Sequence, residues 1–185
     1  MKVILASASP RRKDLLKRIF ENFEIASADI DENIPEGMKN EDAPEYLSIQ
    51  KANAICLNKK DCLIIAADTV VIFNNTILGK PKDNEDAKNM LRNLSGNSHQ
   101  VVTGCCLRYG EKTHSFSVES TVTFYPLSEE DITSYVSSGA SEGKAGAYGI
   151  QDLGSLFVKE IHGDYYNIVG LPIARLNQEI KKIIK

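Results

Sequence analysis

One apolar run constrains the fold more than any other part of the chain. The residues Cys62-Leu63-Ile64-Ile65-Ala66-Ala67 are continuously apolar, and Val70-Val71-Ile72-Phe73 resume the pattern after Asp68-Thr69. A run without polar alternation is typical of a strand that is covered on both faces of its sheet. We therefore predict two buried strands, separated at Asp68-Thr69, in the interior of a sheet.

Asp68 is the residue in this region that most needs an explanation. A carboxylate between strongly apolar segments costs desolvation free energy unless it is paired, protonated or bound to a metal. Asp68 is therefore a candidate functional residue. The alternative is a structural carboxylate that accepts hydrogen bonds from nearby backbone amides, and the residues alone leave both interpretations open.

The N-terminal stretch combines an apolar strand with an anion-binding type of loop. Val3-Ile4-Leu5 is followed by small residues and hydroxyls, then by Pro10 and the adjacent Arg11 and Arg12. Ser9 suits the N-cap of a helix, and proline suits the first helical position. This turn would direct backbone N–H groups and two guanidinium groups at one point, as phosphate binding requires. The alternatives are a capped surface helix and a nucleic-acid-binding arm.

Composition narrows the function classes. The chain has 185 residues, of which 42% are hydrophobic and 25% charged, and we find no repeat or linker, so we predict a single domain over 1–185. The net charge of −3 argues against binding nucleic acid through the overall field. The 4 cysteines lack metal or redox spacing and indicate free thiols in a reducing compartment. No segment suits a signal peptide or a membrane span, so we expect a cytoplasmic protein without membrane or nucleic-acid partners.

The remaining pattern alternates helices with strands. We predict helices over 10–20, 44–57, 84–94 and 129–138, and a last helix that begins at Pro172. Further strands are expected over 2–6, 23–26, 76–78, 99–109, 114–125 and 155–161. Asn74-Asn75 suits a tight turn before 76–78, and apolar residues alternate with polar ones from Phe116 to Phe124. Long strands joined by a tight turn at Gly110-Glu111, beside shorter strands linked by helices, indicate a mixed α/β fold with a mixed sheet.

Three further segments carry candidate chemistry. Lys80 lies between a glycine and Pro81 at a strand exit, which suits a fixed cation but is also common in surface turns. The segment 143–151 combines flexible backbone with one cation, one aromatic ring and one amide, so it is either a ligand-facing loop or a plain connection. The acids Asp29, Asp31 and Glu32 form a solvated turn or bind a hard cation.

Together, five motifs resemble those of the Maf-family nucleotide pyrophosphatases, in order and over essentially the whole chain. The motifs are Ser7-Ala8-Ser9-Pro10-Arg11-Arg12, Ala67-Asp68-Thr69-Val70, Gly79-Lys80-Pro81, His99-Gln100-Val101-Val102-Thr103-Gly104 and Lys144-Ala145-Gly146-Ala147-Tyr148-Gly149-Ile150-Gln151. The resemblance implies a fold related to inosine triphosphate pyrophosphatases. That fold is an elongated mixed sheet with flanking helices, in two lobes around a cleft, and it commonly forms a homodimer.

The resemblance also implies a reaction and roles for particular residues. The reaction is hydrolysis of a nucleoside triphosphate between the α and β phosphates to the monophosphate and pyrophosphate. Asp68 would accept the proton from water, and Glu32 with Asp68 would hold a divalent cation such as magnesium, manganese or cobalt. The residues implied to bind the triphosphate are Ser7, Arg11, Arg12, Lys51 and Lys80.

Substrate choice divides the family into branches. Arg11 after the proline, Thr69 after the acid and Gln151 at the end of the glycine-rich loop resemble the branch that acts on dTTP and UTP, with modified pyrimidine nucleotides as further substrates. The branch acting on 7-methyl-GTP carries an aromatic residue and a glutamine at the first two positions. Gly143 departs from the family pattern, which often has an acid there. A nucleotide-binding regulator of cell division, with no need of Asp68, is the third interpretation.

Overall fold

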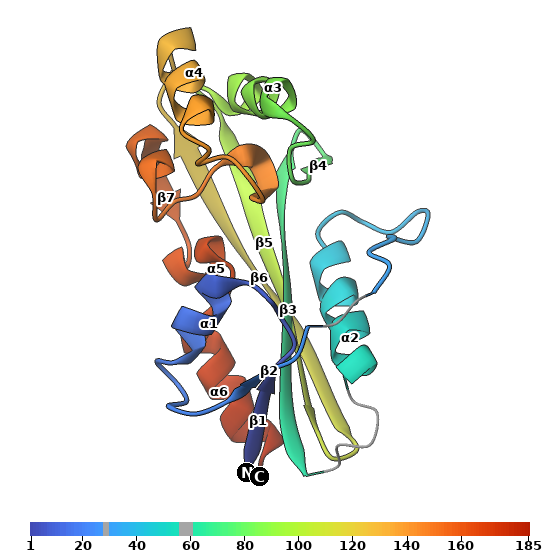
Figure 1. The fold of residues 1–185 in the computed structure, drawn as a ribbon. Coiled ribbons are helices and arrows are strands. Elements are labelled where there is room, and N and C mark those ends of the chain that lie inside the picture. Colours follow the sequence, from blue (N-terminus) through green and yellow to red (C-terminus); the bar gives the residue numbers. More distant parts are fainter. Residues whose placement is uncertain (28–29, 56–60) are drawn as a thin grey trace. The chain divides into compact units, whose positions relative to one another are not determined.

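The computed structural model describes residues 1–27, 30–55 and 61–185 (Figure 1). Over these residues the sheet has seven strands in the order β2-β1-β3-β5-β6-β7, with β4 paired to β3. The strands are β1 Lys2–Leu5, β2 Glu24–Ile25, β3 Cys62–Phe73, β4 Thr76–Leu78, β5 Ser98–Tyr109, β6 Lys112–Phe124 and β7 Val158–His162. β1 pairs in parallel with β2 and β3, whereas the β3–β4 and β6–β7 pairs are antiparallel, so the predicted mixed sheet is confirmed.

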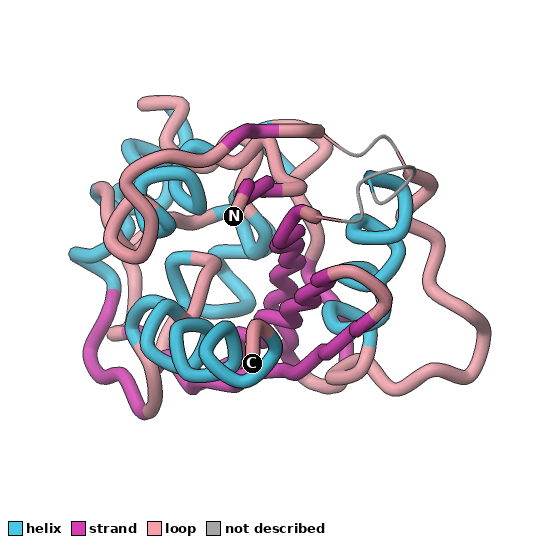
Figure 2. The backbone as a smooth tube through the Cα atoms, turned by 90° about the horizontal axis from the view of Figure 1, so that it is seen from below, coloured by secondary structure: helices cyan, strands magenta, loops and turns pink. Residues whose placement is uncertain are grey.

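Helices connect and cover these strands. They are α1 Pro10–Leu16, α2 Ala43–Ile55, α3 Asn84–Leu94, α4 Glu129–Ser137, α5 Tyr165–Val169 and α6 Ile173–Ile183, with short 3₁₀ segments η1 Ala145–Ala147 and η2 Leu153–Phe157. Seen along the strands, α2 lies on one side of the sheet, and α1 and α6 lie on the other (Figures 1 and 2). None of the helices in the described parts of the chain is long and apolar enough to cross a membrane.

The residues group into two compact units. Unit 1 comprises 1–69, 103–118 and 170–185, and unit 2 comprises 70–102 and 119–169. The three long strands β3, β5 and β6 contribute residues to both units. The single domain and the two lobes around a cleft stay predictions.

The core of unit 1 shows why Asp68 and Thr69 have different surroundings. Ile4, Ile64 and Ala66 pack with Ala52 of α2 and with Cys106 in one buried cluster. Because successive side chains of a strand point to opposite faces, residues of even number in β3 face α2 and residues of odd number face the other side. Asp68 follows Ala66 on the α2 face, and Thr69 points to the opposite face.

The sequence predictions need four corrections. β3 continues through Asp68-Thr69 instead of breaking there, because Lys51 pairs with the Asp68 carboxylate and offsets the cost of an acid within the strand. The first helix ends at Leu16, and the chain then closes further turns up to Phe20. Residues 155–157 belong to η2, so β7 begins only at Val158. The segment before Gly170 contains α5, a short helix that the sequence pattern did not indicate.

Other local predictions are confirmed. Asn74 and Asn75 both have positive φ, as the tight turn between β3 and β4 requires. Ser9 accepts a hydrogen bond from the Arg12 backbone N–H, with Pro10 at the first helical position. Three cysteines, Cys62, Cys105 and Cys106, are free and buried. Asp29, Cys56 and the expected end of the second helix at 56–57 lie outside the described residues.

Candidate active site

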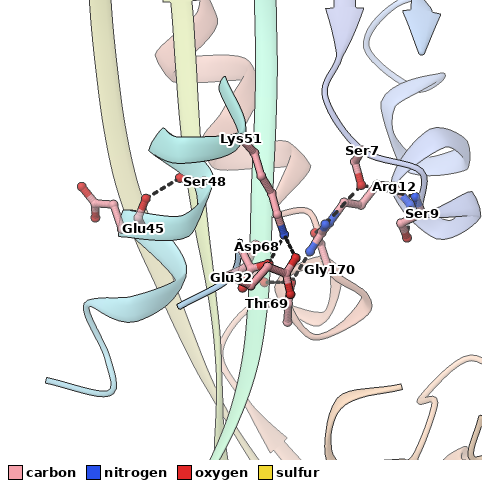
Figure 3. Close-up of polar contacts among 11 residues, drawn as sticks. Ser7, Ser9, Arg12, Glu32, Glu45, Ser48, Lys51, Asp68, Thr69 and Gly170 are labelled. Atoms are coloured by element: carbon pink, nitrogen blue, oxygen red, sulfur yellow. Dashed lines mark hydrogen bonds and ion pairs between the residues drawn. The ribbon is translucent and has the colours of Figure 1, made fainter. Parts of the chain in front are cut away.

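The centre of the site is a lysine that binds two carboxylates. Lys51 Nζ lies 2.5 Å from Asp68 Oδ1 and 2.7 Å from Glu32 Oε1 (Figure 3). The side chains of Lys51 and Asp68 are only 12% and 13% exposed, whereas Glu32 is 54% exposed, so the cluster opens to solvent on the Glu32 side. The buried acid that the sequence singled out is therefore paired with a cation, which offsets its desolvation cost.

The ends of β1 and β3 explain why this point of the sheet is accessible. β1 pairs with β3 only as far as Leu5, opposite Ile65, and the chain then turns into the loop that precedes α1. β3 continues beyond that point, so Asp68 and Thr69 lie past the carboxyl end of its parallel neighbour. Such ends of parallel strands are where open α/β sheets place their ligand sites.

Helix α2 supplies Lys51 because it packs very closely on β5. A Cβ atom at Gly104 would lie 2.2 Å from the backbone nitrogen of Glu45, so only glycine allows this approach. Lys51 lies one turn after Leu47 and Ser48, which are buried, and therefore shares the face of α2 that meets the sheet. This places the ammonium over Asp68.

A second contact fixes the orientation of α2. The Glu45 carboxylate accepts hydrogen bonds from Ser115 at 2.7 Å and from Ser117 at 3.0 Å, both on β6. Ser48 also donates to the Glu45 carbonyl oxygen at 2.7 Å (Figure 3). Sequence reasoning missed Glu45 and Gly104 as supports of the site, since their partners lie about 60 to 70 positions away in the chain.

Arg12 lies on the other face and is held by fixed acceptors. Its Nε donates to the Gly170 carbonyl oxygen at 2.8 Å, one terminal nitrogen to Ser7 Oγ at 3.2 Å, and the other to Thr69 Oγ1 at 2.9 Å (Figure 3). Since a guanidinium carries five N–H donors, two remain for a ligand. Burial lowers the pKa of Arg12, and the nearby Asp68 carboxylate opposes this shift.

Thr69 and Thr103 complete this network. Their hydroxyl oxygens lie 2.9 Å apart, which joins the motif around Asp68 to the motif that ends in Gly104. Thr103 and Gly170 were not among the predicted site residues. Gly170 contributes through its carbonyl oxygen and its φ of +119°, and no side-chain pattern could have indicated that role. Burial raises the pKa of the nearby Cys105 thiol to about 12, which disfavours the thiolate form that a nucleophile needs.

Arg11 differs from its neighbour. Its side chain is half-buried, and across 1–27, 30–55 and 61–185 it makes no hydrogen bond or ion pair. The structure therefore brings together Ser7, Arg12, Thr69, Lys51, Glu32 and Asp68 in unit 1 and leaves Arg11 beside them without a partner in the described chain.

The other predicted residues, Lys80 and Gln151, belong to unit 2. The backbone N–H of Gly146 donates to the Gly79 carbonyl oxygen at 3.1 Å, so the turn that carries Lys80 lies against the glycine-rich segment. Lys80 and Gln151 are both exposed. Two motifs that are about 65 positions apart thus form one surface within this unit.

The carboxylate pair is also the best candidate for a cation site. Glu32 and Asp68 both reach one positively charged atom, the Lys51 nitrogen, and carboxylate oxygens are the donors that hard divalent cations prefer. Within the described residues no group of three or more histidine, cysteine, aspartate or glutamate side chains could hold a metal. Two carboxylates fit a cation such as Mg²⁺, which keeps several waters and takes further oxygens from phosphates.

Comparison with known proteins identifies the family. The sequence pattern of the family described as Maf-like protein matches residues 2–183. The chain belongs to the Maf family. It is 47% identical over 181 residues to a dTTP/UTP pyrophosphatase of Bacillus cereus strain B4264, across 98% of this chain and 95% of that protein. The Bacillus mycoides strain KBAB4 protein of the same name is equally similar, with the same coverage of both chains.

A solved structure supports the fold of this Maf-family chain. A HAM1 protein from Coxiella burnetii superimposes with a TM-score of 0.54 over 98% of this chain and 99% of that one. The identity is 13%, so this likeness concerns the fold. The predicted mixed sheet with flanking helices is confirmed by this comparison and by the strand order.

Proposed function

We propose that this protein hydrolyses dTTP and UTP between the α and β phosphates, releasing the nucleoside monophosphate and pyrophosphate. The relatives named above carry the name dTTP/UTP pyrophosphatase and match almost the whole chain. The observation that carries the proposal is the juxtaposition in unit 1 of Arg12, which keeps two N–H donors for a ligand, with two carboxylates on a single ammonium group.

Asp68 is the proposed proton acceptor. Its Oδ1 is bonded to Lys51, while Oδ2 has no hydrogen-bond donor among the described residues. A water molecule bound at Oδ2 can pass its proton to the carboxylate while its oxygen attacks phosphorus, and the bond from that phosphorus to the bridging oxygen breaks. A positioned base of this kind typically contributes about 10²–10⁴-fold to the rate.

The basic side chains are proposed to neutralise the phosphates. Arg12 is oriented before substrate arrives, because Ser7, Thr69 and Gly170 hold it, and its remaining donors suit phosphate oxygens. We propose that Arg11, Lys80 and Lys51 also bind the triphosphate through their positive charges. Gln151 is proposed to select the base, because its amide can both donate to and accept from a pyrimidine edge.

We propose Glu32 and Asp68 as the ligands of a divalent cation, Mg²⁺, Mn²⁺ or Co²⁺. When bound, the cation would neutralise charge on the phosphate oxygens and on the departing pyrophosphate. The fit rests on the carboxylate oxygens that already surround one positive charge.

We also propose a cytoplasmic homodimer without nucleic-acid partners. The three described cysteines are buried free thiols, which suits a reducing compartment. Sedimentation of the purified protein at several concentrations, with and without dTTP and Mg²⁺, would test the dimer. A monomer at all concentrations would contradict it.

The activity is tested by a substrate panel. The purified protein is incubated with natural, modified and 7-methylated nucleoside triphosphates and each of the three cations, and pyrophosphate release is measured. We expect dTTP and UTP to be the preferred natural substrates. Preference for 7-methyl-GTP would assign the chain to the other branch, and binding without pyrophosphate release from any triphosphate would favour a nucleotide-binding regulator.

A further inference from the structure

Two sequence motifs of unit 2 meet in a buried hydrogen bond. His99 Nε2 lies 2.8 Å from the Tyr148 hydroxyl oxygen, and the two residues are only 2% and 6% exposed. Both rings contact Phe124 edge to face, with ring centroids 5.0 and 4.8 Å apart. This hydrogen bond is therefore shielded from water. A hydrogen bond in such a buried environment stabilises the fold more than one at the protein surface.

The bond joins two neutral groups. Burial lowers the pKa of His99 to about 4 and raises the pKa of Tyr148, so neither side chain is charged near neutral pH. His99 Nδ1 is buried and has no partner among the described residues. The Tyr148 hydroxyl is thus the one polar group shown to bind this imidazole, and losing it would leave the ring without a hydrogen bond.

The segment that follows Tyr148 is held at several further points. The backbone N–H of Gly149 donates to the Tyr135 hydroxyl at 3.1 Å, and the N–H of Asp152 donates to the Gly149 carbonyl oxygen at 3.2 Å. The second bond closes a turn over 149–152 that has Gln151 at its corner. Lys144 lies 3.1 Å from Asp152 and ties the start of the loop to the end of this turn.

The backbone before Tyr148 is strained. Ala147 has a φ of +60° although it is not glycine, and Gly146 has a φ of +68° with the Val71 side chain 3.1 Å from where a Cβ atom would lie. A non-glycine residue in this region costs free energy and persists only where its surroundings enforce it. Tyr148 directly follows Ala147, and its buried side chain holds the backbone in this conformation.

We propose that the His99–Tyr148 hydrogen bond positions Gln151 and thereby sets the preference among pyrimidine bases. This inference rests on the base-selecting role proposed above for Gln151. His99 and Tyr148 are then positioning residues: neither touches the nucleotide, and both act through the turn at 149–152.

The first test removes one hydroxyl group. Tyr148→Phe keeps the ring and its packing, and Tyr125→Phe removes a hydroxyl from a 53% exposed side chain elsewhere in unit 2. The ratio of kcat/KM for dTTP to that for dCTP is measured in both variants. We expect the ratio to fall about 5- to 10-fold in Tyr148→Phe, the worth of one hydrogen bond, with kcat for dTTP changed less than about twofold. Tyr125→Phe should keep the original ratio.

A second pair of variants separates positioning from general stability. His99→Gln retains a polar atom that can bond to the Tyr148 hydroxyl, whereas His99→Leu does not. We expect His99→Gln to keep most of the selectivity ratio and His99→Leu to lose it. Equal ratios in all of these variants would overturn the inference.

Hydrogen exchange gives a readout that does not depend on turnover. In Tyr148→Phe the hydrogen-bonded amides of Gly149 and Asp152 should exchange about 5- to 10-fold faster, because the turn opens more often. Unchanged exchange at these amides would also overturn the inference. If the unmodified protein released pyrophosphate from no triphosphate, the proposed function would be wrong, and the exchange rates would still decide whether Tyr148 holds this turn.

Discussion

The carboxylate site of unit 1 and the glycine-rich loop of unit 2 hold their functional side chains by different forces. Asp68 is bound by a charged group, Lys51, and Arg12 is bound by oxygen acceptors of the protein. The turn that carries Gln151 is held mainly by neutral hydrogen bonds of the Tyr135 and Tyr148 hydroxyls. The chemistry of bond breaking needs charges close to the phosphate, whereas selection of a neutral base needs shape and hydrogen bonds.

The largest expected effect comes from removing the charge of the carboxylate site. Asp68→Asn should lower kcat for dTTP by about 10³-fold, the loss of a general base, and should leave binding of a non-hydrolysable dTTP analogue within about threefold. Steady-state kinetics and titration calorimetry measure the two effects. Asp14→Asn, at a 70% exposed acid on α1, is the control. A near-normal rate in a folded Asp68→Asn protein would exclude Asp68 as the base.

The neutral network of unit 2 should show itself in the pH dependence of stability. The pKa of His99 is lowered to about 4 in the folded protein against 6.5 ordinarily, so between these pH values the unfolded state binds more protons. Stability should therefore be complete above about pH 6.5 and fall as the pH drops towards 4, by on the order of 3 kcal/mol from this residue. Urea unfolding at a series of pH values measures this change in the free energy of unfolding.

His99→Gln is the reference for that measurement, because it has no group that titrates in this range. We expect the difference in unfolding free energy between pH 7 and pH 4.5 to be smaller in His99→Gln than in the unmodified protein. Equal pH dependence would show that folding does not lower the pKa of His99, because the folded and unfolded states would then bind protons alike at this residue.

The two regions also differ in how closely their glycines are packed. A Cβ atom at Gly104 would meet the backbone of α2 at 2.2 Å, whereas at Gly149 it would meet the flexible ends of Lys144 and Asp152 at 2.7 and 2.8 Å. We expect Gly104→Ala to cost about 2 kcal/mol or more and Gly149→Ala less than about 1 kcal/mol, because side chains move more readily than a helix. Urea unfolding of both variants measures this. A larger cost at Gly149 would contradict it.

The smallest expected effect is at the ion pair between Lys144 and Asp152 at the glycine-rich loop. Asp152 is 49% exposed where it meets Lys144, and such pairs contribute little in water. Asp152→Asn should lower the free energy of unfolding by about 0.5 kcal/mol, and by less at high salt. Thermal unfolding at low and high ionic strength measures it. A loss as large as that of Gly104→Ala would mean that charge, and not neutral hydrogen bonding, holds the loop.

Much of the fold could be predicted from short segments. The cap at Ser9, the turn at Asn74-Asn75 and the alternation from Phe116 to Phe124 each depend on residues close together in the chain. The predicted break in β3 has a tertiary origin. The acid interrupts the apolar run in sequence, but the cation that pairs with it, Lys51, comes from a helix earlier in the chain.

The sequence by itself determined the residue types of the site: an acid within an apolar strand, arginines after a proline, and an amide after a run of small residues. Only the tertiary structure decided which of these are held and by what. Arg12 has three fixed acceptors and the adjacent Arg11 has none among the described residues, although both arginines belong to the same motif after Pro10. The reason is that acceptors such as the Gly170 carbonyl oxygen, 158 positions away, become neighbours only when the chain folds.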